Sequence, residues 1–332
     1  MNYLVTGAAG FIGFHVAARL CAAGHQVVGL DNLNHYYDVN LKRARLARLL
    51  ALPGFRFVEQ DLCNLPAINS LFAEGRFERV IHLAAQGGVR HSLEQPFAYS
   101  ESNITGMLSV LEGCRHHGVG HLIYASSSSV YGLEGSLPSR ADAPAGHPVS
   151  LYAASKRAGE LMAHSYSHLY AIPTTGLRFF TVYGPWGRPD MALFKFVRAA
   201  LADEPLDLYN HGELARDFTY IDDIVEGVLR ITERPPQGCP TWRGEADASP
   251  APYRLYNIGH GEPVRLETFV EAIEQALGRP VRRRLLPMQP GDVAATWADS
   301  APLLATTGYR PQTGVCEGVK AFVDWYLDYY RV

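Results

Sequence analysis

The chain has 332 residues, of which 47% are hydrophobic, and its formal net charge at pH 7 is −3. This length suffices for one large domain and a smaller one, with enough apolar side chains for a proper core. The charges are mixed in sign and no basic, aromatic-rich stretch occurs, which argues against nucleic acid as a partner.

The sequence carries no sign of export, membrane insertion or metal binding. Residues 1–6 form no basic leader, and no hydrophobic run is long enough to span a bilayer. The five cysteines are scattered and never in CxxC spacing, which favours reduced thiols over disulfides or zinc. The thirteen histidines form no HExxH pattern. We therefore expect a cytoplasmic protein without a metal or a membrane partner.

A glycine-rich turn follows the first predicted strand. Residues 2–6 are a short apolar run that leads into TGAAGFIG, after which apolar residues recur at helical spacing. In such a turn Gly7 permits the tight bend, Gly10 lets backbone N–H groups approach a pyrophosphate, and Gly13 allows helix and strand to pack closely. The pattern predicts dinucleotide binding, although a glycine pattern alone is often only a loop.

An acidic residue at the end of the second strand supports that interpretation. The predicted strand 25–30 ends in Asp31 and Asn32, roughly 20 residues after the turn, where a carboxylate binds the adenosine ribose. No arginine adjoins Asp31 in the sequence, which favours NAD over NADP.

Strands and helices then alternate. A helix is expected over about 39–51, strands over 55–58, 79–83 and 121–125, and a long helix over about 96–117. Apolar strands separated by helices are typical of a Rossmann-type, doubly wound parallel sheet, so we predict an α/β fold.

Small and polar residues at strand ends extend the predicted cofactor site. Ala84, Ala85 and Gln86 follow the fourth strand and would let the cofactor lie close to the backbone. Asp61, followed by Leu62, is placed to hydrogen-bond the adenine. Without the neighbouring motifs, an ordinary strand exit and turn would be the preferred interpretation of these positions.

The main candidates for catalytic residues follow the fifth predicted strand. Four serines, residues 126–129, precede a helix expected over about 151–170 that carries Tyr152 and Lys156. Residues four apart share a helix face, so the phenol and the ammonium can point into one pocket. A lysine cation about 4 Å from a phenol, at an effective dielectric near 20, contributes about 4 kcal/mol and lowers the phenol pKa by roughly 3 units. Taken alone, a Tyr-x3-Lys pair is more often a solvated helix face.

The second half of the chain has a different character. After Arg178 it becomes richer in proline, glycine and aromatic residues, which predicts a mainly substrate-binding α/β domain over 179–332 after a cofactor domain over 1–178. Some of its segments are expected to return to the first domain. Helices are expected over about 191–202, 266–277 and 316–330.

Two further predictions concern connections in this half. Residues 234–254 lack periodicity and are rich in proline and glycine, so we expect an exposed loop. Asp222 and Asp223 are expected to cap the helix that follows them rather than to take part in chemistry.

Together the motifs resemble the extended short-chain dehydrogenase/reductase family and, within it, the nucleotide-sugar epimerases. TGAAGFIG, HLAAQ, SSSSVYG, YAASK and RFFTVYGP occur in the family's order over nearly the whole chain. More narrowly, LDNLNHYYDVNLKRARL, RDFTYIDDIVEG and MQPGDVAATWAD are similar to UDP-glucuronate 4-epimerases, which interconvert UDP-glucuronate and UDP-galacturonate.

The resemblance implies an NAD that stays bound between turnovers. The residues expected to contact it are Gly7, Gly10, Phe11, Ile12, Gly13, Asp31, Asn32, Asp61, Leu62, Ala84, Ala85, Gln86, Tyr152 and Lys156.

The resemblance also implies the catalytic roles. Tyr152 would remove the proton of the sugar 4-hydroxyl while the C4 hydride moves to NAD, and Lys156 would hold the nicotinamide ribose and lower the tyrosine pKa. Ser127 would hydrogen-bond the 4-oxygen, and Ser128 and Ser129 would line the sugar pocket. The 4-keto sugar would then rotate and receive the same hydride on its other face.

Four more residues are expected to bind the substrate. Oxidation of a uronate at C4 gives a β-keto acid that can lose carbon dioxide, so its carboxylate must be held. Arg188 suits this because guanidinium binds carboxylate bidentately, with Thr181 as a helper. By the resemblance Arg216 contacts the diphosphate and Asp292 the uridine ribose, while Arg90 adds charge near the sugar or phosphate. The alternative for Arg188 is an arginine in a surface loop without a role in binding. The alternative for Asp292 is an aspartate that only forms a turn.

The serine register separates this chain from related enzymes. Sugar-nucleotide dehydratases carry an Asp-Glu pair where it has Ser128 and Ser129, because eliminating water needs an acid and a base, and decarboxylases have Glu at the Ser129 position. The predicted activity is C4 epimerisation of UDP-glucuronate. The alternatives are C4 epimerisation of a neutral UDP-hexose such as UDP-glucose or UDP-N-acetylglucosamine, decarboxylation of UDP-glucuronate, and a non-catalytic NAD-binding regulator. Relatives use the helices near 96–117 and 151–170 as a dimer interface, so a homodimer is expected.

Overall fold

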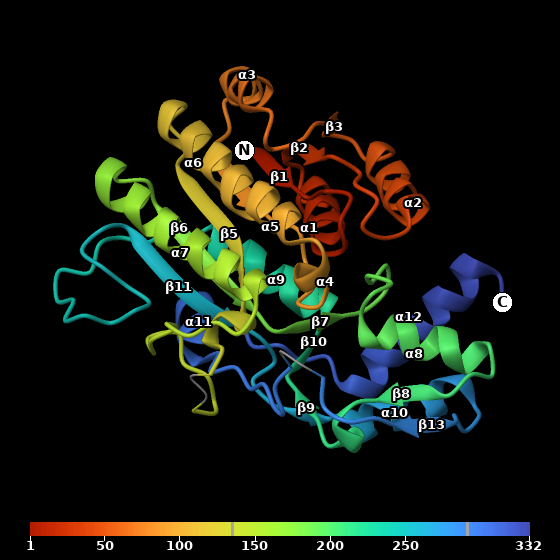
Figure 1. Ribbon diagram of the computed structural model, residues 1–332. Coiled ribbons are helices and arrows are strands. Elements are labelled where there is room, and N and C mark those ends of the chain that lie inside the picture. The colour runs from red at the N-terminus through yellow and green to blue at the C-terminus, as the bar shows by residue number, and fades with distance from the viewer. Residues whose placement is uncertain (134–135, 290–291) are drawn as a thin grey trace.

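The computed structural model describes residues 1–133, 136–289 and 292–332 (Figure 1). Within these residues, seven parallel strands form one sheet in the order β11-β6-β5-β4-β1-β2-β3. The strands are β1 (Asn2–Thr6), β2 (Gln26–Asp31), β3 (Phe55–Glu59), β4 (Arg79–His82), β5 (His121–Ser127), β6 (Thr174–Phe179) and β11 (Tyr253–Ile258). The strand order reverses between β1 and β4, where a doubly wound sheet opens a crevice for ligands. The predicted fold class is confirmed.

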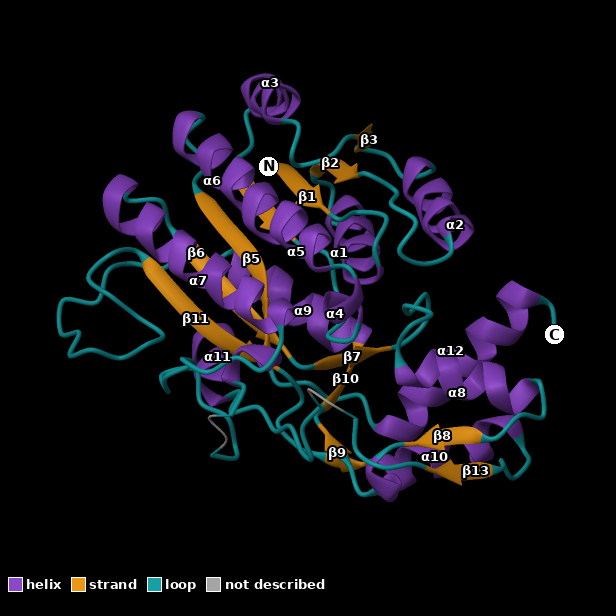
Figure 2. Ribbon diagram, viewed as in Figure 1, coloured by secondary structure: helices purple, strands orange, loops and turns teal. Residues whose placement is uncertain are grey.

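Helices cover both faces of this sheet, and Figure 2 shows α6 and α7 lying across one of them. The helices of the sheet region are α1 (Phe11–Ala22), α2 (Val39–Leu50), α3 (Leu65–Gly75), α4 (His91–Glu94), α5 (Pro96–Tyr99), α6 (Gly106–His116), α7 (Leu151–Tyr170), α9 (Ile221–Thr232) and α11 (Ala301–Thr307). Successive strand residues enter different cores: Leu4 packs with the α3 and α6 side, and Val5 with the α1 and α9 side. This alternation explains why each strand reads as a continuous apolar run.

The long helix expected over 96–117 is interrupted. Between α5 and α6 lies a π-helical turn, η1 (Ser100–Thr105), and a 3-10 turn, η2 (Ser128–Tyr131), follows β5. A π turn inserts one residue and rotates the side chains that follow, and such turns are frequent at functional sites. Here it places Asn103 in the protein interior.

The rest of the chain forms a smaller region beside the carboxyl ends of the large sheet (Figure 1). Its elements are β7 (Thr181–Tyr183), α8 (Ala192–Leu201), β8 (Leu206–Leu208), η3 (Asn210–Gly212), β9 (Ala215–Arg216), β10 (Phe218–Tyr220), β12 (Val264–Arg265), α10 (Leu266–Leu277), β13 (Arg283–Leu285) and α12 (Val315–Tyr330). Its strands pair two by two, β10 with β7, β12 with β9 and β13 with β8. The three helices predicted for this half are confirmed as α8, α10 and α12.

The prediction that 234–254 is an exposed loop is wrong in its second part. Residues 241–245 are exposed, but residues 247–249 are buried against β11. Asp247 forms an ion pair of 3.2 Å with Arg254, and its carbonyl oxygen accepts a hydrogen bond of 2.8 Å from the Leu255 N–H. This pairing satisfies the buried backbone, which a periodicity search does not detect.

The predicted capping role of Asp222 and Asp223 is also wrong. The residue that precedes α9 is Tyr220, and no side chain caps the helix. The Asp223 carboxylate accepts hydrogen bonds from the Gln312 and Thr313 N–H groups at 3.1 and 3.0 Å, and from the Tyr309 hydroxyl. Both aspartates lie inside the first helical turn and not at the position before it. Asp223 therefore does not cap α9 but connects a distant loop to it.

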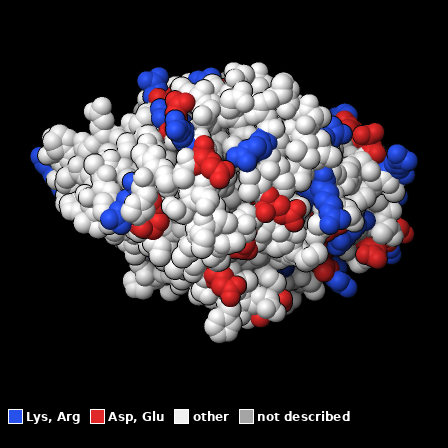
Figure 3. Space-filling view, turned by 90° about the horizontal axis from the view of Figure 1, so that it is seen from above, with Lys and Arg blue, Asp and Glu red and all other residues white. Residues whose placement is uncertain are grey.

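Further features of the described residues bear on the sequence predictions. In the part of the chain that the structure describes, no helix is long and apolar enough to span a membrane, and no three His, Cys, Asp or Glu side chains gather as metal ligands. All five cysteines are free thiols. On the face shown in Figure 3, basic and acidic side chains lie interspersed between wide uncharged areas.

Candidate active site

One cavity of about 1010 Å³ lies at the carboxyl ends of the sheet strands and extends into the smaller region. Every residue that the sequence predicted as a cofactor or substrate contact lines it. They are Gly7, Gly10, Phe11, Ile12, Gly13, Asp31, Asn32, Asp61, Leu62, Ala84, Ala85, Gln86, Arg90, Ser127, Ser128, Ser129, Tyr152, Lys156, Thr181, Arg188, Arg216 and Asp292. Of the motif around Asp292, Pro290 and Gly291 lie outside the described residues.

Close backbone packing shapes the glycine turn at one end of this cavity. Gly7 has a φ of +71°, and a Cβ on it would lie 2.8 Å from the Ala84 nitrogen, so a side chain there would push the turn away from the end of β4. A Cβ on Gly13 would lie 2.1 Å from the Gly7 oxygen, so a side chain there would push α1 away from the turn. Gly10 precedes α1 and no side chain caps that helix, which leaves its first N–H groups for an anionic ligand.

The acidic residues of this end are held by neighbouring polar groups. The buried Asp31 carboxylate accepts hydrogen bonds from the Ala9 N–H at 3.1 Å and the Leu33 N–H at 2.9 Å. Burial raises the pKa of Asp31, and nearby Lys42 and these two N–H groups offset part of that rise. Asn32 donates a hydrogen bond of 2.7 Å to Asp61. This bond connects two residues that are both expected to contact the adenosine.

Tyr152 and Lys156 lie in the first two turns of α7. The helix begins after Ser150, whose hydroxyl accepts a hydrogen bond of 3.1 Å from the Ala153 N–H. The Lys156 ammonium donates to the Ala125 carbonyl oxygen at 2.9 Å. Burial, with a contribution from the charge of Arg188, lowers the pKa of Lys156 to about 8.

The serines line the same cavity as this pair. The Ser127 hydroxyl donates to the Ser129 hydroxyl at 3.2 Å and accepts from the Ser129 N–H at 3.2 Å. Ser128 also lines the cavity. These hydrogen bonds fix the start of η2 and keep the Ser127 oxygen at the cavity wall.

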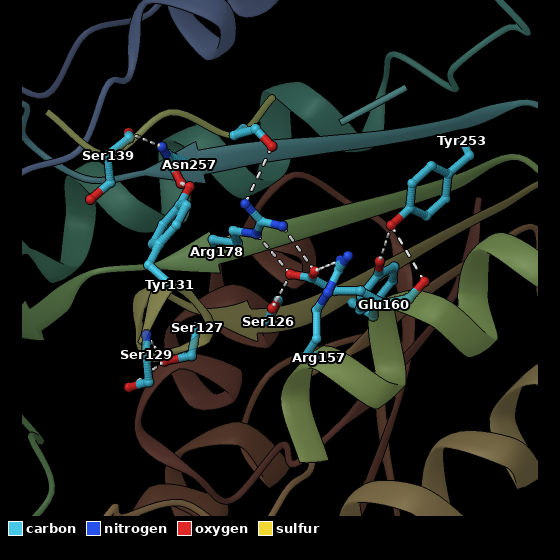
Figure 4. A network of polar contacts seen from close by, with 12 residues as sticks. Ser126, Ser127, Ser129, Tyr131, Ser139, Arg157, Glu160, Arg178, Tyr253 and Asn257 are labelled. Atoms are coloured by element: carbon cyan, nitrogen blue, oxygen red, sulfur yellow. Dashed lines mark hydrogen bonds and ion pairs between the residues drawn. The ribbon is translucent and has the colours of Figure 1, made fainter. Parts of the chain in front are cut away.

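A buried ion-pair network lies next to the serines (Figure 4). Arg178 binds Glu160 in a bidentate manner at 2.8 and 2.9 Å, and neither side chain is exposed. Glu160 also accepts from the Ser126 hydroxyl at 2.6 Å and from Arg157 at 2.7 Å. Although burial opposes its charge, these donors lower the pKa of Glu160 below its ordinary value. The network joins β5, β6 and α7 and so fixes Ser127 relative to Tyr152.

Sequence reasoning missed Asn103. Its amide oxygen accepts the Gln86 N–H at 2.8 Å, and its amide nitrogen donates to the Gln86 carbonyl at 3.1 Å and to the Ser155 hydroxyl at 2.9 Å. Ser155 in turn donates to the Tyr152 carbonyl at 2.8 Å. Asn103 therefore links the end of β4 to the helix of Tyr152 and Lys156. The sequence offered one signal, an asparagine inside a predicted helix, where this residue is unfavourable. That signal does not indicate which residues the side chain binds.

Two of the three predicted substrate arginines have a carboxylate partner. Arg188 binds Asp190 at 3.0 and 2.5 Å, and the Tyr36 hydroxyl donates to Asp190 at 3.1 Å. Burial opposes the charge of Arg188, but Asp190 outweighs it, and the pKa of Arg188 is raised. Arg216 binds Asp292 at 2.7 Å, so two predicted substrate contacts bind each other. The sequence did not predict Asp190 or Tyr36 at the site.

Arg90 differs from these two arginines. Its guanidinium lies over the ring of Tyr209, 5.0 Å from the ring centre. Cations in this position are attracted to the ring face while one side stays available to a ligand.

Residues 3–259 of the chain match the NAD dependent epimerase/dehydratase family. The chain belongs to this family. It is 50% identical over 335 residues to a probable UDP-glucuronate 4-epimerase of Rhizobium meliloti (strain 1021), covering 100% of this chain and 98% of that protein. It is 46% identical to UDP-glucuronate 4-epimerase 1 of Arabidopsis thaliana, covering 99% of this chain and 77% of that protein. The crystal structure of a UDP-glucuronic acid 4-epimerase from Bacillus cereus, in complex with UDP-glucuronic acid and NAD, superposes with a TM-score of 0.88 at 32% identity, covering 99% and 100% of the two chains.

The arrangement in this epimerase/dehydratase family member suits oxidation and reduction at one carbon. A phenol, an ammonium and a serine hydroxyl line one part of the cavity, and a glycine turn at a helix N-terminus lines its other end. Arg188, which follows β7 in the chain, and Arg216 of β9 also line the cavity and offer positive charge to an anionic substrate.

Proposed function

We propose that the chain is an NAD-dependent UDP-glucuronate 4-epimerase, which interconverts UDP-glucuronate and UDP-galacturonate at C4. The observation that carries this proposal is the single cavity that holds Tyr152, Lys156 and Ser127 together with the arginine Arg188. An acid–base triad and a carboxylate-binding group in one cavity match a uronate substrate. The names of the related proteins support the same conclusion.

The cofactor end fits an adenine dinucleotide. The uncapped N-terminus of α1 suits a pyrophosphate, and the lack of a Cβ at Gly7 and Gly13 lets the turn pack closely against Ala84 and α1. Asp31 and Asn32 at the end of β2 would hold the adenosine ribose. NAD bound there supplies a hydride acceptor for C4 and, in the return step, a hydride donor.

Tyr152 would act as the base. Its phenolate takes the proton of the 4-hydroxyl, while the hydroxyl of Ser127 donates a hydrogen bond to the same oxygen. The ammonium of Lys156 lies on the same helix face and stabilises the negative charge on the phenolate. When the keto group is reduced, Tyr152 returns the proton, so epimerisation consumes no net acid or base.

Arg188 and Thr181 would hold the substrate carboxylate. Arg188 is already charged and directed toward Asp190, so an incoming carboxylate would share or replace that partner. Arg216 would bind the diphosphate, Asp292 the uridine ribose, and Arg90 the sugar or phosphate oxygens. Ser128 and Ser129 would contact the sugar hydroxyls.

We further propose a homodimer that works in the cytosol. Large apolar side chains on α5 and α7 are exposed, with Phe97 exposed to 79% and Leu161 to 55%, and a second copy would bury them. The free thiols support a reducing compartment. Sedimentation analysis should show a dimer for the wild type and a monomer for Leu161→Glu. Leu50→Glu, a change at an exposed leucine of α2, should leave the dimer intact, and a wild-type monomer would contradict the proposal.

The direct test is to incubate the purified protein with UDP-glucuronate without added cofactor and to identify the products by NMR. UDP-galacturonate is expected, because the cofactor should remain bound through purification. A UDP-pentose as the main product would make the chain a decarboxylase. Turnover of UDP-glucose or UDP-N-acetylglucosamine with none of UDP-glucuronate would assign a neutral substrate, and no turnover of any of them with NAD added would leave only a binding role.

A further inference from the structure

Hydrogen bonds to three consecutive carbonyl oxygens connect the loop that carries Arg188 to the cofactor side of the molecule. The Pro185 oxygen lies 3.0 Å from Nε2 of His15, which is on α1. The Trp186 and Gly187 oxygens accept hydrogen bonds from the Arg45 guanidinium, on α2, at 2.6 and 3.2 Å. Burial lowers the pKa of His15 to about 4, so near neutral pH it is an uncharged hydrogen-bond donor to Pro185.

Arg45 joins this loop to the glycine turn. Its side chain is fully buried, and its other terminal nitrogen donates to the Ala9 carbonyl at 3.0 Å and to the Tyr37 hydroxyl at 2.8 Å. A buried cation is costly unless its donors are fixed on acceptors, so the guanidinium constrains every group that it binds. One side chain therefore holds the cofactor turn and the Arg188 loop in a fixed relation.

Trp186 shows that this loop conformation is imposed by its surroundings. Its φ of +62° is unusual for a bulky residue. Its ring packs against those of Phe14, Trp325 and Tyr329, with centroids 5.6, 5.2 and 5.0 Å away. The ring cluster anchors the side chain, and Arg45 fixes the carbonyl of the same residue.

The space around the Arg188 guanidinium is tight. A Cβ on Gly87 would lie 2.7 Å from its Nη1, so Gly87 bounds one side, and Asp190 binds it on another. A small shift of residues 185–187 would therefore change the direction in which Arg188 meets a ligand.

We propose that Arg45, assisted by His15, is a positioning residue that sets how much substrate is epimerised and how much is decarboxylated. This inference rests on the proposed function. In the 4-keto uronate, the C5–C6 bond breaks when its electron pair aligns with the keto group. Carbon dioxide leaves, an enolate forms and takes a proton at C5, and return of the C4 hydride gives a UDP-pentose. By fixing Arg188, Arg45 keeps the carboxylate out of that alignment.

The test is the ratio of UDP-pentose to UDP-galacturonate formed by the full-length protein, measured by NMR. Arg45→Lys keeps the charge and the stem but loses the planar fork that reaches the Ala9 carbonyl with one nitrogen and the Trp186 and Gly187 carbonyls with the other. It should raise the ratio about tenfold, which corresponds to about 1.4 kcal/mol of lost discrimination. Arg43→Lys is the matched control, because Arg43 is exposed on the same helix, and it should leave the ratio unchanged.

A second variant removes a single hydrogen bond. His15→Phe keeps a ring that can pack against Phe11 and Phe14 but cannot donate to Pro185, so a smaller rise in the same ratio is expected. If Arg45→Lys does not fold, His15→Phe decides. A destabilised fold alone would lower the amount of active enzyme and leave the product ratio unchanged. An unchanged ratio in the folded variants would overturn this inference alone, whereas a wild type that forms no UDP-galacturonate would overturn the proposed function on which it rests.

Discussion

The two ends of the cavity hold their charged groups in different ways. At the cofactor end, Asp31 accepts from two backbone N–H groups, and Lys156 donates to a backbone carbonyl. At the substrate end each of two arginines binds a carboxylate side chain, Arg188 binding Asp190 and Arg216 binding Asp292, and Arg216 also donates to the Ala215 and Ala294 carbonyls.

This difference separates a preformed site from an adaptable one. Backbone groups cannot move without disturbing the strands and turns that carry them, so the cofactor end keeps its shape. Carboxylate side chains can rotate away, so they compensate the arginine charges until the anionic groups of a substrate arrive. An unpaired buried charge would otherwise destabilise the fold.

The largest expected effect on activity comes from removing the base, Tyr152, which lies at the junction of the two ends. Tyr152→Phe should lower the rate of epimerisation by about a thousandfold, in line with the contribution of general acid–base catalysis. The rate is measured by NMR of the sugar nucleotides, and thermal unfolding should be unchanged. Tyr170→Phe, at the far end of the same helix, is the control and should keep full activity. Comparable loss in both variants would remove the assigned role of Tyr152.

The end of the cavity that holds the serines can be loosened at the buried Arg178–Glu160 ion pair. Arg178→Met leaves Glu160 buried and charged, so the free energy of unfolding should fall by about 3–5 kcal/mol, as measured by urea denaturation. Arg115→Met removes a partly exposed ion pair with Glu112 and should cost less than about 1 kcal/mol. Equal costs would mean that the buried pair does not stabilise this end.

The two arginines of the substrate end should have different roles. Arg216→Met should raise KM for UDP-glucuronate by about 10–100-fold without changing the products, since one charge-assisted contact to the diphosphate is lost. Arg188→Met should also raise the fraction of UDP-pentose, because the carboxylate is no longer held. Product analysis by NMR together with steady-state kinetics separates these outcomes. If only the Arg216 variant formed UDP-pentose, the assignments of Arg216 to the diphosphate and of Arg188 to the carboxylate would be reversed.

The smallest expected effect is a shift in pH dependence. The pKa of Lys156 is lowered from 10.5 to about 8, so its ammonium loses the proton as pH rises through about 8. Because the protonated form stabilises the phenolate of the base, kcat/KM should fall above that pH. In Arg188→Met the fall should move to higher pH, since the charge of Arg188 contributes to the lowering. An unmoved profile would mean that another group titrates.

The sequence predicted the cofactor end more completely than the substrate end. The glycine turn, Asp31 and the Tyr152–Lys156 pair each lie within a few residues of a strand end or on one helix, so their geometry follows from local periodicity. The contacts between Arg216 and Asp292, and between Asn103 and Gln86, join segments far apart in the chain, which no local pattern predicts. The π turn at Asn103 and the unusual φ of Trp186 are likewise imposed by tertiary contacts.

The same reasoning explains the two wrong predictions. Asp223 lies where a helix-capping acid is common, but a loop ninety positions later in the chain takes its carboxylate. Residues 247–249 have the composition of an exposed loop, yet backbone hydrogen bonds and an ion pair to β11 bury them.

In the proposed reaction, one bound NAD takes a hydride from C4 and returns it to the same carbon. This transfer can be followed by NMR with UDP-glucuronate that carries deuterium at C4, incubated with the purified protein in ordinary water. The UDP-galacturonate formed should retain the deuterium at C4. Replacement of that deuterium by solvent hydrogen would exclude direct return of the hydride from NAD.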